Sequence, residues 1–156
     1  MAIAVNRRGI EFLEYFPIAE SDLYSDGFRP LLFTFIIIRY NGQFLLVHHR
    51  KRQSWELPGG HIEDGESARD CAFRELYEET NQTVESLEFK AALKFHDGHR
   101  NSTFFSALFS GQLSSPAAFH CNDEISQITF WEWGTDIGYT DEIDTAVMGL
   151  LRAGRV

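Results

Sequence analysis

The chain has 156 residues, of which 44% are hydrophobic and 24% are charged, as in an ordinary globular domain. We expect one domain spanning residues 1–156. Asp and Glu total 23 against 14 Lys and Arg, which gives a net charge of -9. This acidic balance argues against binding of a nucleic-acid polymer, because such proteins present a basic face. It does not exclude a small phosphate ligand, since a bound divalent cation inverts the local charge.

Nothing in the sequence predicts a membrane partner. The first residues lack an apolar stretch followed by a cleavage site of small residues. The most apolar run, Leu31 to Ile38, is far shorter than the roughly 20 residues that a membrane helix needs. Cys71 and Cys121 are too few for a disulfide framework, which favours reduced thiols. We therefore expect a cytoplasmic protein.

The first predicted elements are the two strands of a β-hairpin. Two apolar runs, 31–40 and 43–50, flank Asn41-Gly42. This pair favours a type I′ turn, because both central residues of that turn need positive φ. The first run is apolar on both faces, as expected for a strand that is covered on both sides. Residues 50–66 are rich in charge and turn formers and are predicted to form a loop.

A helix is predicted to begin after Ser67, which has Asp70 three residues later and so resembles a capping box. Asn81 is the expected end of the helix, because Asn tolerates the left-handed conformation that closes many helices. One stripe of small and apolar residues is expected to face the core. This stripe comprises Ala68, Cys71, Ala72, Leu76 and Thr80.

The second half of the chain predicts more strands and a closing helix. Runs 84–96 and 102–113 flank Asp97-Gly98 and predict a second hairpin, and residues 114–123 read as a loop. A strand is expected over 125–133 and a helix over 141–151, with Thr140 or Asp141 as its cap. Strands and helices that interleave in this way predict an α/β fold, with a mixed sheet packed against helices.

Three acids crowd the end of the first predicted helix. Positions three and four apart are neighbours on a helix, so Glu75 lies beside both Glu78 and Glu79. Each exposed pair costs about 0.2–0.5 kcal/mol, and each acid near the negative helix end costs about 0.3–1 kcal/mol. A solvated acidic face is one interpretation. The other is a site for Mg²⁺ or Mn²⁺, since clustered carboxylates suit hard cations.

The surroundings of these acids favour the metal site. The chain from residue 60 to residue 82 resembles the Nudix box, Gx5Ex7REUxEExGU with U a bulky aliphatic residue, of the Nudix (MutT-like) hydrolase family. The matching residues are Gly60, Glu66, Arg74, Glu75, Leu76, Glu78 and Glu79. Two positions depart from the pattern, with Asn81 in place of Gly and Gln82 in place of an aliphatic residue. We expect Asn81 to adopt the same turn and Gln82 to lie at the edge of packing.

The resemblance implies a fold and a chemistry. The fold is a mixed sheet sandwiched between helices, in which the box forms a loop, a helix and a loop. The activity is hydrolysis of a nucleoside diphosphate linked to another moiety, with water attacking phosphorus. The resemblance implies Mg²⁺ as cofactor, with Mn²⁺ as a substitute. The cation would neutralise the diphosphate and acidify the attacking water.

The resemblance also implies roles for individual residues of the box. Glu78 and Glu79 would be the principal metal ligands, and Glu75 would be a further ligand or the base. The backbone carbonyl of Gly59 or of its neighbour Gly60 would be another ligand. Two more residues would support the site: Arg74 would orient a glutamate through charge-assisted hydrogen bonds, and Glu66 would hold the metal or its water.

Candidates outside the box are less sharply defined. The base role moves within the family to later loops, and Glu124, with Asp123 as the alternative, is our candidate here. Arg50 and Arg52, with Lys51 between them, are candidates to meet substrate phosphates; the alternative is a solvated loop. Trp55 is a candidate to stack on a nucleobase, and the alternative is a core position. The other aromatic candidates are Phe33, Phe35, Phe130 and Trp131.

The substrate is predicted by elimination. The stretch Asp97–Arg100 lacks the proline of ADP-ribose hydrolases of the family and the tyrosine of its dinucleoside polyphosphate hydrolases. We therefore expect a nucleoside triphosphate, such as 8-oxo-dGTP, to be cut to the monophosphate and pyrophosphate. The alternatives are a nucleotide sugar or dinucleoside polyphosphate hydrolase, and a nucleotide sensor without catalysis. The expected partner is a small molecule, and a homodimer stays open.

Overall fold

The computed structural model describes residues 1–156, and strand β3 (Leu31–Tyr40) lies in the interior of its sheet. It lies in a sheet with the order β1-β2-β7-β8-β3-β4-β5, in which β6 is a further neighbour of β3 and β9 of β4. Two α-helices complete the fold. The strands are β1 (Ala4–Val5), β2 (Ile10–Phe16), β3 (Leu31–Tyr40), β4 (Gln43–His49), β5 (Ser54–Glu56), β6 (Gly59–His61), β7 (Glu88–Asp97), β8 (Ser102–Gln112) and β9 (Ile125–Trp131). The helices are α1 (Ala68–Thr80) and α2 (Glu142–Arg152), and two short 3₁₀ helices span Glu20–Tyr24 and Asp26–Phe28.

The sheet is mixed, as expected. β3 pairs in parallel with β8 along most of its length and antiparallel with β6 and β4 on its other edge. β4 meets β3 only near the hairpin turn, at Arg39 and Tyr40, and then pairs with β5 and β9. This leaves the first half of that β3 edge to the three residues of β6.

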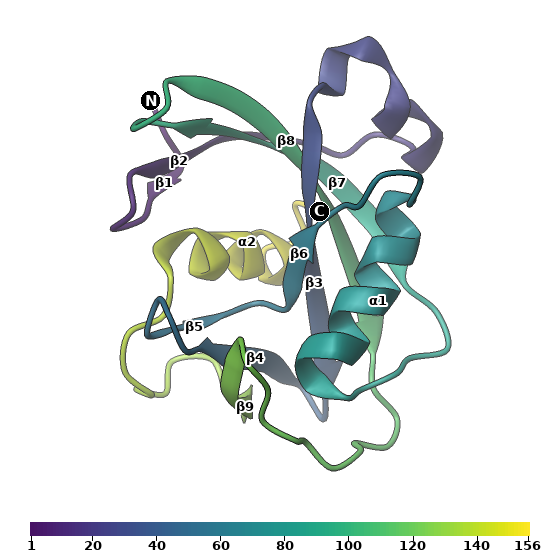
Figure 1. Ribbon diagram of the computed structural model, residues 1–156, viewed down its shortest axis with the longest axis vertical. Coiled ribbons are helices and arrows are strands. Elements are labelled where there is room, and N and C mark those ends of the chain that lie inside the picture. The colour runs from purple at the N-terminus through teal and green to yellow at the C-terminus, as the bar shows by residue number, and fades with distance from the viewer.

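The two α-helices cover opposite faces of β3 (Figure 1). Ile36 and Ile38 pack under α1, whereas Ile37 packs in the second core beneath α2, and all three are fully buried. The prediction of a strand covered on both faces is therefore confirmed. The predicted α/β class, with a mixed sheet between helices, is confirmed as well. Neither α1 nor α2 is long and apolar enough to cross a membrane.

Most of the local predictions are confirmed. Asn41 and Gly42 both have positive φ, 50° and 77°, as the hairpin turn requires. The Oγ atom of Ser67 accepts a hydrogen bond of 3.0 Å from the Asp70 N–H at the start of α1. Asn81 ends that helix in the left-handed conformation, with φ 59°. The predicted stripe of α1 from Ala68 to Thr80 is buried.

Three parts of the structure differ from the sequence-based expectation. The loop predicted over 50–66 contains β5 and β6, which are each three residues long and take their order from pairing with β4 and β3. β1 and β2 were not predicted from the sequence. The last helix begins one residue later than expected, after Asp141, whose side chain caps it by accepting a hydrogen bond from the Ile143 N–H.

Candidate functional site

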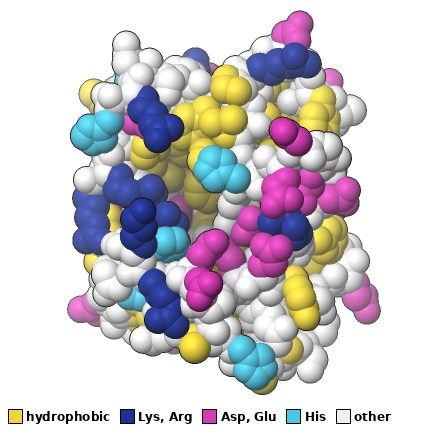
Figure 2. Space-filling view, in the orientation of Figure 1, with side chains coloured by type: hydrophobic (Ala, Val, Ile, Leu, Met, Phe, Trp, Pro, Cys, Tyr) yellow, Lys and Arg dark blue, Asp and Glu magenta, His cyan; other side chains and the backbone are white.

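A cavity of about 200 Å³ brings the clustered glutamates together with a later loop. The α1 residues Glu75, Glu78 and Glu79 form one side of this cavity. The other side is the segment 122–124, which ends with Glu124 just before β9. Figure 2 shows acidic side chains on one side of a hydrophobic hollow and Lys and Arg side chains on its other side. The acids of the box and the expected base thus share one space.

Glu79 is the most buried of these acids, with 7% of its surface exposed. Its Oε1 atom accepts a hydrogen bond of 2.9 Å from the Gly59 N–H. Burial raises the pKa of Glu79 well above its usual value, and the nearby Glu75 and Glu124 raise it further, against the opposing effect of the Gly59 N–H. Burying an acid among other acids is unfavourable, so this position is stabilised by any cation that joins it.

Glu75 lies against the backbone of β6. The glycine at position 60 makes room for it, because a Cβ atom there would come 2.5 Å from the Glu75 Cδ atom. At position 59, a Cβ atom would clash with the carbonyl oxygen of Thr34. Burial raises the pKa of Glu75, and hydrogen bonding to Arg74 opposes that rise. Gly59 and Gly60 therefore allow β6 to lie between β3 and the acids of α1.

Arg74 connects the acids to one another. Its Nε and Nη2 atoms donate to the two carboxylate oxygens of Glu66, at 2.7 and 2.9 Å. Its Nη1 atom donates to Glu75 at 2.9 Å and to Glu78 at 3.1 Å. Hydrogen bonding to Arg74 lowers the pKa of Glu66 to about 2. Glu66 does not line the cavity, so its contacts support Arg74 rather than reach the shared space.

The register of β6 distinguishes the two candidate carbonyls. Gly60 lies opposite Thr34. Hydrogen bonds from Ile36 N–H to Pro58 O and from Ile62 N–H to Leu32 O join the residue pairs two positions to either side. Because hydrogen-bonded pairs alternate along an antiparallel ladder, the N–H and carbonyl of Gly60 also point toward β3. Gly59 is the alternate residue, so its N–H and carbonyl point away from β3, and its N–H meets Glu79. The Gly59 carbonyl is therefore the one on the side of the acids.

The residues at this site fit a divalent cation in their chemistry. Every side-chain and backbone atom around the cavity that could bind a metal ion is an oxygen, which suits Mg²⁺ and Mn²⁺ and disfavours soft metals. No group of three or more Asp, Glu, His or Cys side chains is already gathered closely enough to hold a metal. Two of the glutamates, Glu75 and Glu78, are instead paired with Arg74 at 2.9 and 3.1 Å.

The loop that carries Glu124 is held by Arg50. The Arg50 N–H donates to the Glu124 carbonyl at 2.8 Å, and its Nε atom donates to the Asn122 carbonyl at 2.7 Å. The Glu124 N–H in turn donates to the Asn122 side chain at 3.1 Å. Arg50 was expected to contact substrate, whereas its contacts here fix the backbone around Glu124. Asp123, the alternative base, also lines the cavity.

Arg52 and Trp55, both expected to contact substrate, make contacts within the protein itself. Arg52 forms a two-pronged ion pair with the buried Glu56, at 2.8 and 2.7 Å. Trp55 is 9% exposed and donates its ring N–H to the Ile137 carbonyl at 2.9 Å. Neither residue lines the cavity with the glutamates. Trp131 is likewise buried in the core.

A series of aromatic rings lies on the other side of β6 from α1. His61 and Phe33 have ring centroids 4.0 Å apart, and Phe33 and Phe104 are 5.4 Å apart. The series continues through Phe95 to Phe35. His61 is exposed, and Phe33 and Phe104 are half-buried. Phe104 and His61 were not among the sequence candidates, because only the pairing of β3 with β6 and β8 places them beside Phe33.

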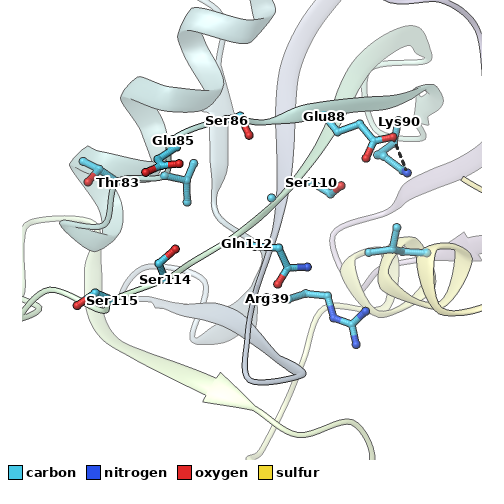
Figure 3. A pocket seen from close by; sticks show the side chains of 13 residues that line it. Arg39, Thr83, Glu85, Ser86, Glu88, Lys90, Ser110, Gln112, Ser114 and Ser115 are labelled. Atoms are coloured by element: carbon cyan, nitrogen blue, oxygen red, sulfur yellow. Dashed lines mark hydrogen bonds and ion pairs between the residues drawn. The ribbon is translucent and has the colours of Figure 1, made fainter.

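A larger cavity, of about 750 Å³, lies elsewhere (Figure 3). The loop after α1 and the ends of β3 and β8 form it, and its charged lining residues are Arg39, Lys90, Glu85 and Glu88. The Lys90 ammonium is paired with Glu88 at 3.3 Å. This cavity contains none of the box glutamates and no aromatic side chain, so we place the candidate site at the smaller cavity.

Comparisons with known proteins show a family match that includes the candidate site. A family model described as NUDIX domain matches residues 30–135. An RNA pyrophosphohydrolase of Shewanella sp. (strain ANA-3) is 46% identical over 63 residues. That match covers 40% of this chain and only 36% of the relative's own length.

Solved structures with low sequence identity share the fold. A variant of the Bacillus subtilis pyrophosphohydrolase BsRppH matches with a TM-score of 0.72 at 18% identity, over 99% of this chain and 98% of that one. The NUDIX domain of Shewanella oneidensis NrtR, solved with ADP ribose, matches with a TM-score of 0.67 at 17% identity. That match covers 89% of this chain and 100% of the domain. The expected fold is therefore confirmed over nearly the whole chain.

Proposed function

The chain belongs to the Nudix family, and from this premise we propose that it is a pyrophosphohydrolase acting on a nucleoside diphosphate-linked substrate. One observation carries the proposal: Glu75, Glu78, Glu79 and Glu124 line one cavity, although the last comes from a loop more than forty residues further along the chain. A solvated acidic face would have no reason to bury Glu79 or to surround it with other acids.

The chain's own residues have distinct roles in this proposal. A bound Mg²⁺, for which Mn²⁺ could substitute, would neutralise the diphosphate and acidify a water molecule. Glu78, Glu79 and the Gly59 carbonyl would hold it, with Glu75 as a further ligand. Arg74 keeps Glu75 and Glu78 oriented through its hydrogen bonds.

Glu124 is the proposed general base. Its carboxylate takes a proton from the attacking water as the water oxygen bonds to phosphorus. The bond between phosphorus and the bridging oxygen breaks, and the leaving group keeps that electron pair. Asp123 and Glu75 remain alternatives, since both line the same cavity. A pH profile of turnover in a Glu124→Gln variant distinguishes Glu124 from the other two, because only loss of the true base removes the acidic limb.

The substrate we propose is a nucleoside triphosphate, which is cut to the monophosphate and pyrophosphate. Aromatic rings support recognition of a base, because Phe33 and Phe104 are half-buried and His61 is exposed, next to the β6 edge that carries Gly59. An oxidised purine such as 8-oxo-dGTP is the specific compound that we propose. We also propose that the protein acts in the cytoplasm, because Cys71 and Cys121 are both free thiols.

A second candidate substrate is the 5′-triphosphate end of an RNA. The curated relatives that match part of the chain are called RNA pyrophosphohydrolases, which favours this candidate. The net charge of -9 favours the free nucleotide instead, because an RNA chain would meet a predominantly acidic protein. The two candidates share the bond that is cleaved, and an RNA chain attached to the 3′ side of the first nucleotide distinguishes the second from the first.

A substrate panel in ¹⁸O-labelled water, followed by phosphorus NMR, tests the proposal. The panel contains 8-oxo-dGTP, dGTP, ADP-ribose, a nucleotide sugar, a dinucleoside polyphosphate and a 5′-triphosphorylated RNA oligonucleotide. We expect Mg²⁺-dependent release of pyrophosphate from a triphosphate, with the label on one product. Binding without release of phosphate or pyrophosphate from any compound would identify a nucleotide sensor and contradict the proposed enzyme.

A further inference from the structure

Amide side chains fasten the loop 113–124, which carries Glu124, to the end of α1. The Gln82 side chain pairs with the backbone of Ala117, accepting its N–H at 2.7 Å and donating to its carbonyl at 2.8 Å. Asn81 donates to the next carbonyl, that of Ala118, at 2.8 Å. These three bonds join segments that are more than thirty residues apart in the sequence.

Asn122 makes the third connection, close to the base itself. Its Nδ2 atom approaches the carbonyls of Glu78 and Glu79 at 3.4 and 3.5 Å. These carbonyls belong to the last turn of α1, where backbone acceptors lack partners within the helix. Its Oδ1 atom accepts from the N–H groups of Glu124 and Ile125, at 3.1 and 2.9 Å. The Asn122 side chain therefore contacts both the last turn of α1, which carries the proposed metal ligands, and the backbone of Glu124.

Asn81 and Gln82 are the two positions at which this chain departs from the Nudix box. Neither glycine nor an aliphatic residue could form the bonds to the loop, because both lack a polar side chain. Gln82 is 1% exposed, so its amide depends on Ala117 and on the Thr80 carbonyl for its hydrogen bonds. A buried amide without partners would destabilise the folded protein. The polar side chains at positions 81 and 82 therefore complement the backbone of the loop that packs against them.

We propose that Asn81, Gln82 and Asn122 form an amide clasp, whose function is to hold Glu124 over Glu78 and Glu79. They are positioning residues, since they act through the loop rather than on the substrate. The kinetic part of this inference rests on the proposed function, in which Glu124 is the base. The structural part, that the clasp holds the loop, does not depend on catalysis.

Two substitutions open the clasp without disturbing α1. Gln82→Leu places the aliphatic residue of the family pattern in the same buried position. Asn81→Gly keeps the positive φ of 59°, which glycine adopts without strain, and removes the bond to Ala118. The matched control is Gln127→Leu, which changes an exposed amide on β9. Thermal unfolding of each full-length variant verifies that it is folded.

Hydrogen–deuterium exchange of the loop tests the structural part. We expect backbone amides of 113–124 to exchange at least about tenfold faster in Gln82→Leu and Asn81→Gly, which corresponds to losing about 1.4 kcal/mol of local stability. The rest of the chain and the Gln127→Leu control should exchange as the unmodified protein does. Unchanged exchange in both clasp variants would overturn the inference.

Kinetics combined with Glu124→Gln tests the positioning role. We expect kcat to fall about 10- to 100-fold in the clasp variants, because a shift of about 1 Å in a catalytic group can cost a hundredfold. KM and Mg²⁺ affinity should stay within about twofold, since α1 keeps its ligands. Adding Glu124→Gln to Gln82→Leu should cost little more than Glu124→Gln alone. Full additivity, or unchanged kcat with a loosened loop, would overturn the positioning role.

Failure of the proposed function would have a different signature. The unmodified protein would then cleave no compound of the panel, and the positioning role would fall with the enzyme. The exchange experiment would still decide whether the clasp fastens the loop, because it needs no substrate.

Discussion

The carboxyl group of Glu75 occupies the space that a side chain on Gly60 would need. A Cβ atom on Gly60 would lie 2.5 Å from the Glu75 Cδ atom and within 2.7 Å of both carboxylate oxygens. The first glycine of the box and its first helical glutamate are therefore complementary in shape. The glycine is required by a neighbour fifteen residues later in the chain, rather than by a backbone conformation that only glycine adopts.

This relationship predicts the effect of Gly60→Ala. The added methyl group must displace Glu75, because the three nearest heavy atoms to its position all belong to the Glu75 carboxyl group. We expect turnover to fall at least about tenfold, because a proposed ligand of the catalytic cation leaves its place. Steady-state kinetics at saturating Mg²⁺ measures this, and Gly27→Ala is the control, because nothing lies within 4 Å of its Cβ position. Normal turnover in Gly60→Ala would show that Glu75 can act from elsewhere.

The proposed ligands Glu78 and Glu79 predict a loss of activity without a loss of folding. Glu78→Gln and Glu79→Gln should each lower turnover at least about tenfold, because each removes charge that stabilises the transition state. The amide in Glu79→Gln still accepts the Gly59 N–H and removes a buried acid, so its thermal midpoint without metal should not fall. Glu85→Gln, an exposed acid beyond α1, is the control. Near-normal turnover in either ligand variant would remove that residue from the metal site.

Removal of divalent cations should abolish hydrolysis and lower thermal stability. A cation that binds only the folded protein at a hundred times its dissociation constant adds about 2.7 kcal/mol to the free energy of unfolding. We expect Mg²⁺ to raise the midpoint of the unmodified protein and to raise that of Glu79→Gln much less. Calorimetry across a Mg²⁺ titration measures both. Robust hydrolysis in excess EDTA would exclude the metal from the mechanism.

Arg52 should affect stability rather than substrate binding. Breaking a fully buried ion pair costs about 3–5 kcal/mol. The Arg52 side chain is 33% exposed and Glu56 only 9%, so we expect Arg52→Ala to cost about 2–3 kcal/mol, with KM unchanged. Urea unfolding and steady-state kinetics of the same preparation separate the two effects. Arg155→Ala, which changes an exposed arginine far along the chain from the site, should change neither. A raised KM with unaltered stability would restore the role expected from the sequence.

The buried carboxyl group of Asp144 should make the free energy of unfolding depend on pH. This fully enclosed acid accepts the Leu57 N–H at 3.0 Å, and its burial, followed by the charges of Asp141 and Glu56, raises its pKa well above the usual value. The native protein therefore binds the proton more tightly than the unfolded chain does. The contribution of Asp144 is fully present below its unfolded pKa, of about 3.9, and is lost as the pH rises toward its folded pKa.

Asp144→Asn should remove this dependence. An amide oxygen can still accept the Leu57 N–H, and no proton is exchanged on unfolding. The free energy of unfolding of the variant, minus that of the unmodified protein, should increase from about pH 4 upward, with a slope of at most about 1.4 kcal/mol per pH unit. Urea unfolding between pH 4 and 8 measures the difference. A difference that is flat with pH would mean that Asp144 is ionised in the native protein over this whole range.

Elements whose physical cause is local could be predicted from the sequence. Asn41-Gly42 needs only its own backbone to form the turn, and Ser67 needs only the N–H three residues later. The acids of α1 are brought together by the helical repeat alone, which is why spacing sufficed to identify them. Glu124 lies far from the box in the sequence, so its place in the cavity depends on the packing of the loop against α1.

Positions decided by distant partners were missed or wrongly predicted. Gln82 was expected at the edge of packing, yet it is buried, because Ala117 offers its amide two backbone partners from another part of the chain. The ion pair of Arg52 with Glu56, by contrast, joins residues only four apart, and it was missed because residues 50–66 were predicted to form a loop. β6 has too few residues for an alternating pattern, and only β3 gives it a partner.

The parallel pairing of β3 with β8 has a consequence for how the molecule is assembled during synthesis. Residue 34 is matched with residue 107, so the sheet cannot close around its central strand until two-thirds of the chain has left the ribosome. The box helix is complete well before that point. Until β8 arrives, β3 presents an unpaired apolar edge, which favours aggregation. The exposure is prolonged because contacts between residues distant in sequence form slowly. Slower elongation or a chaperone after residue 112 should therefore matter more for yield than any change within the box.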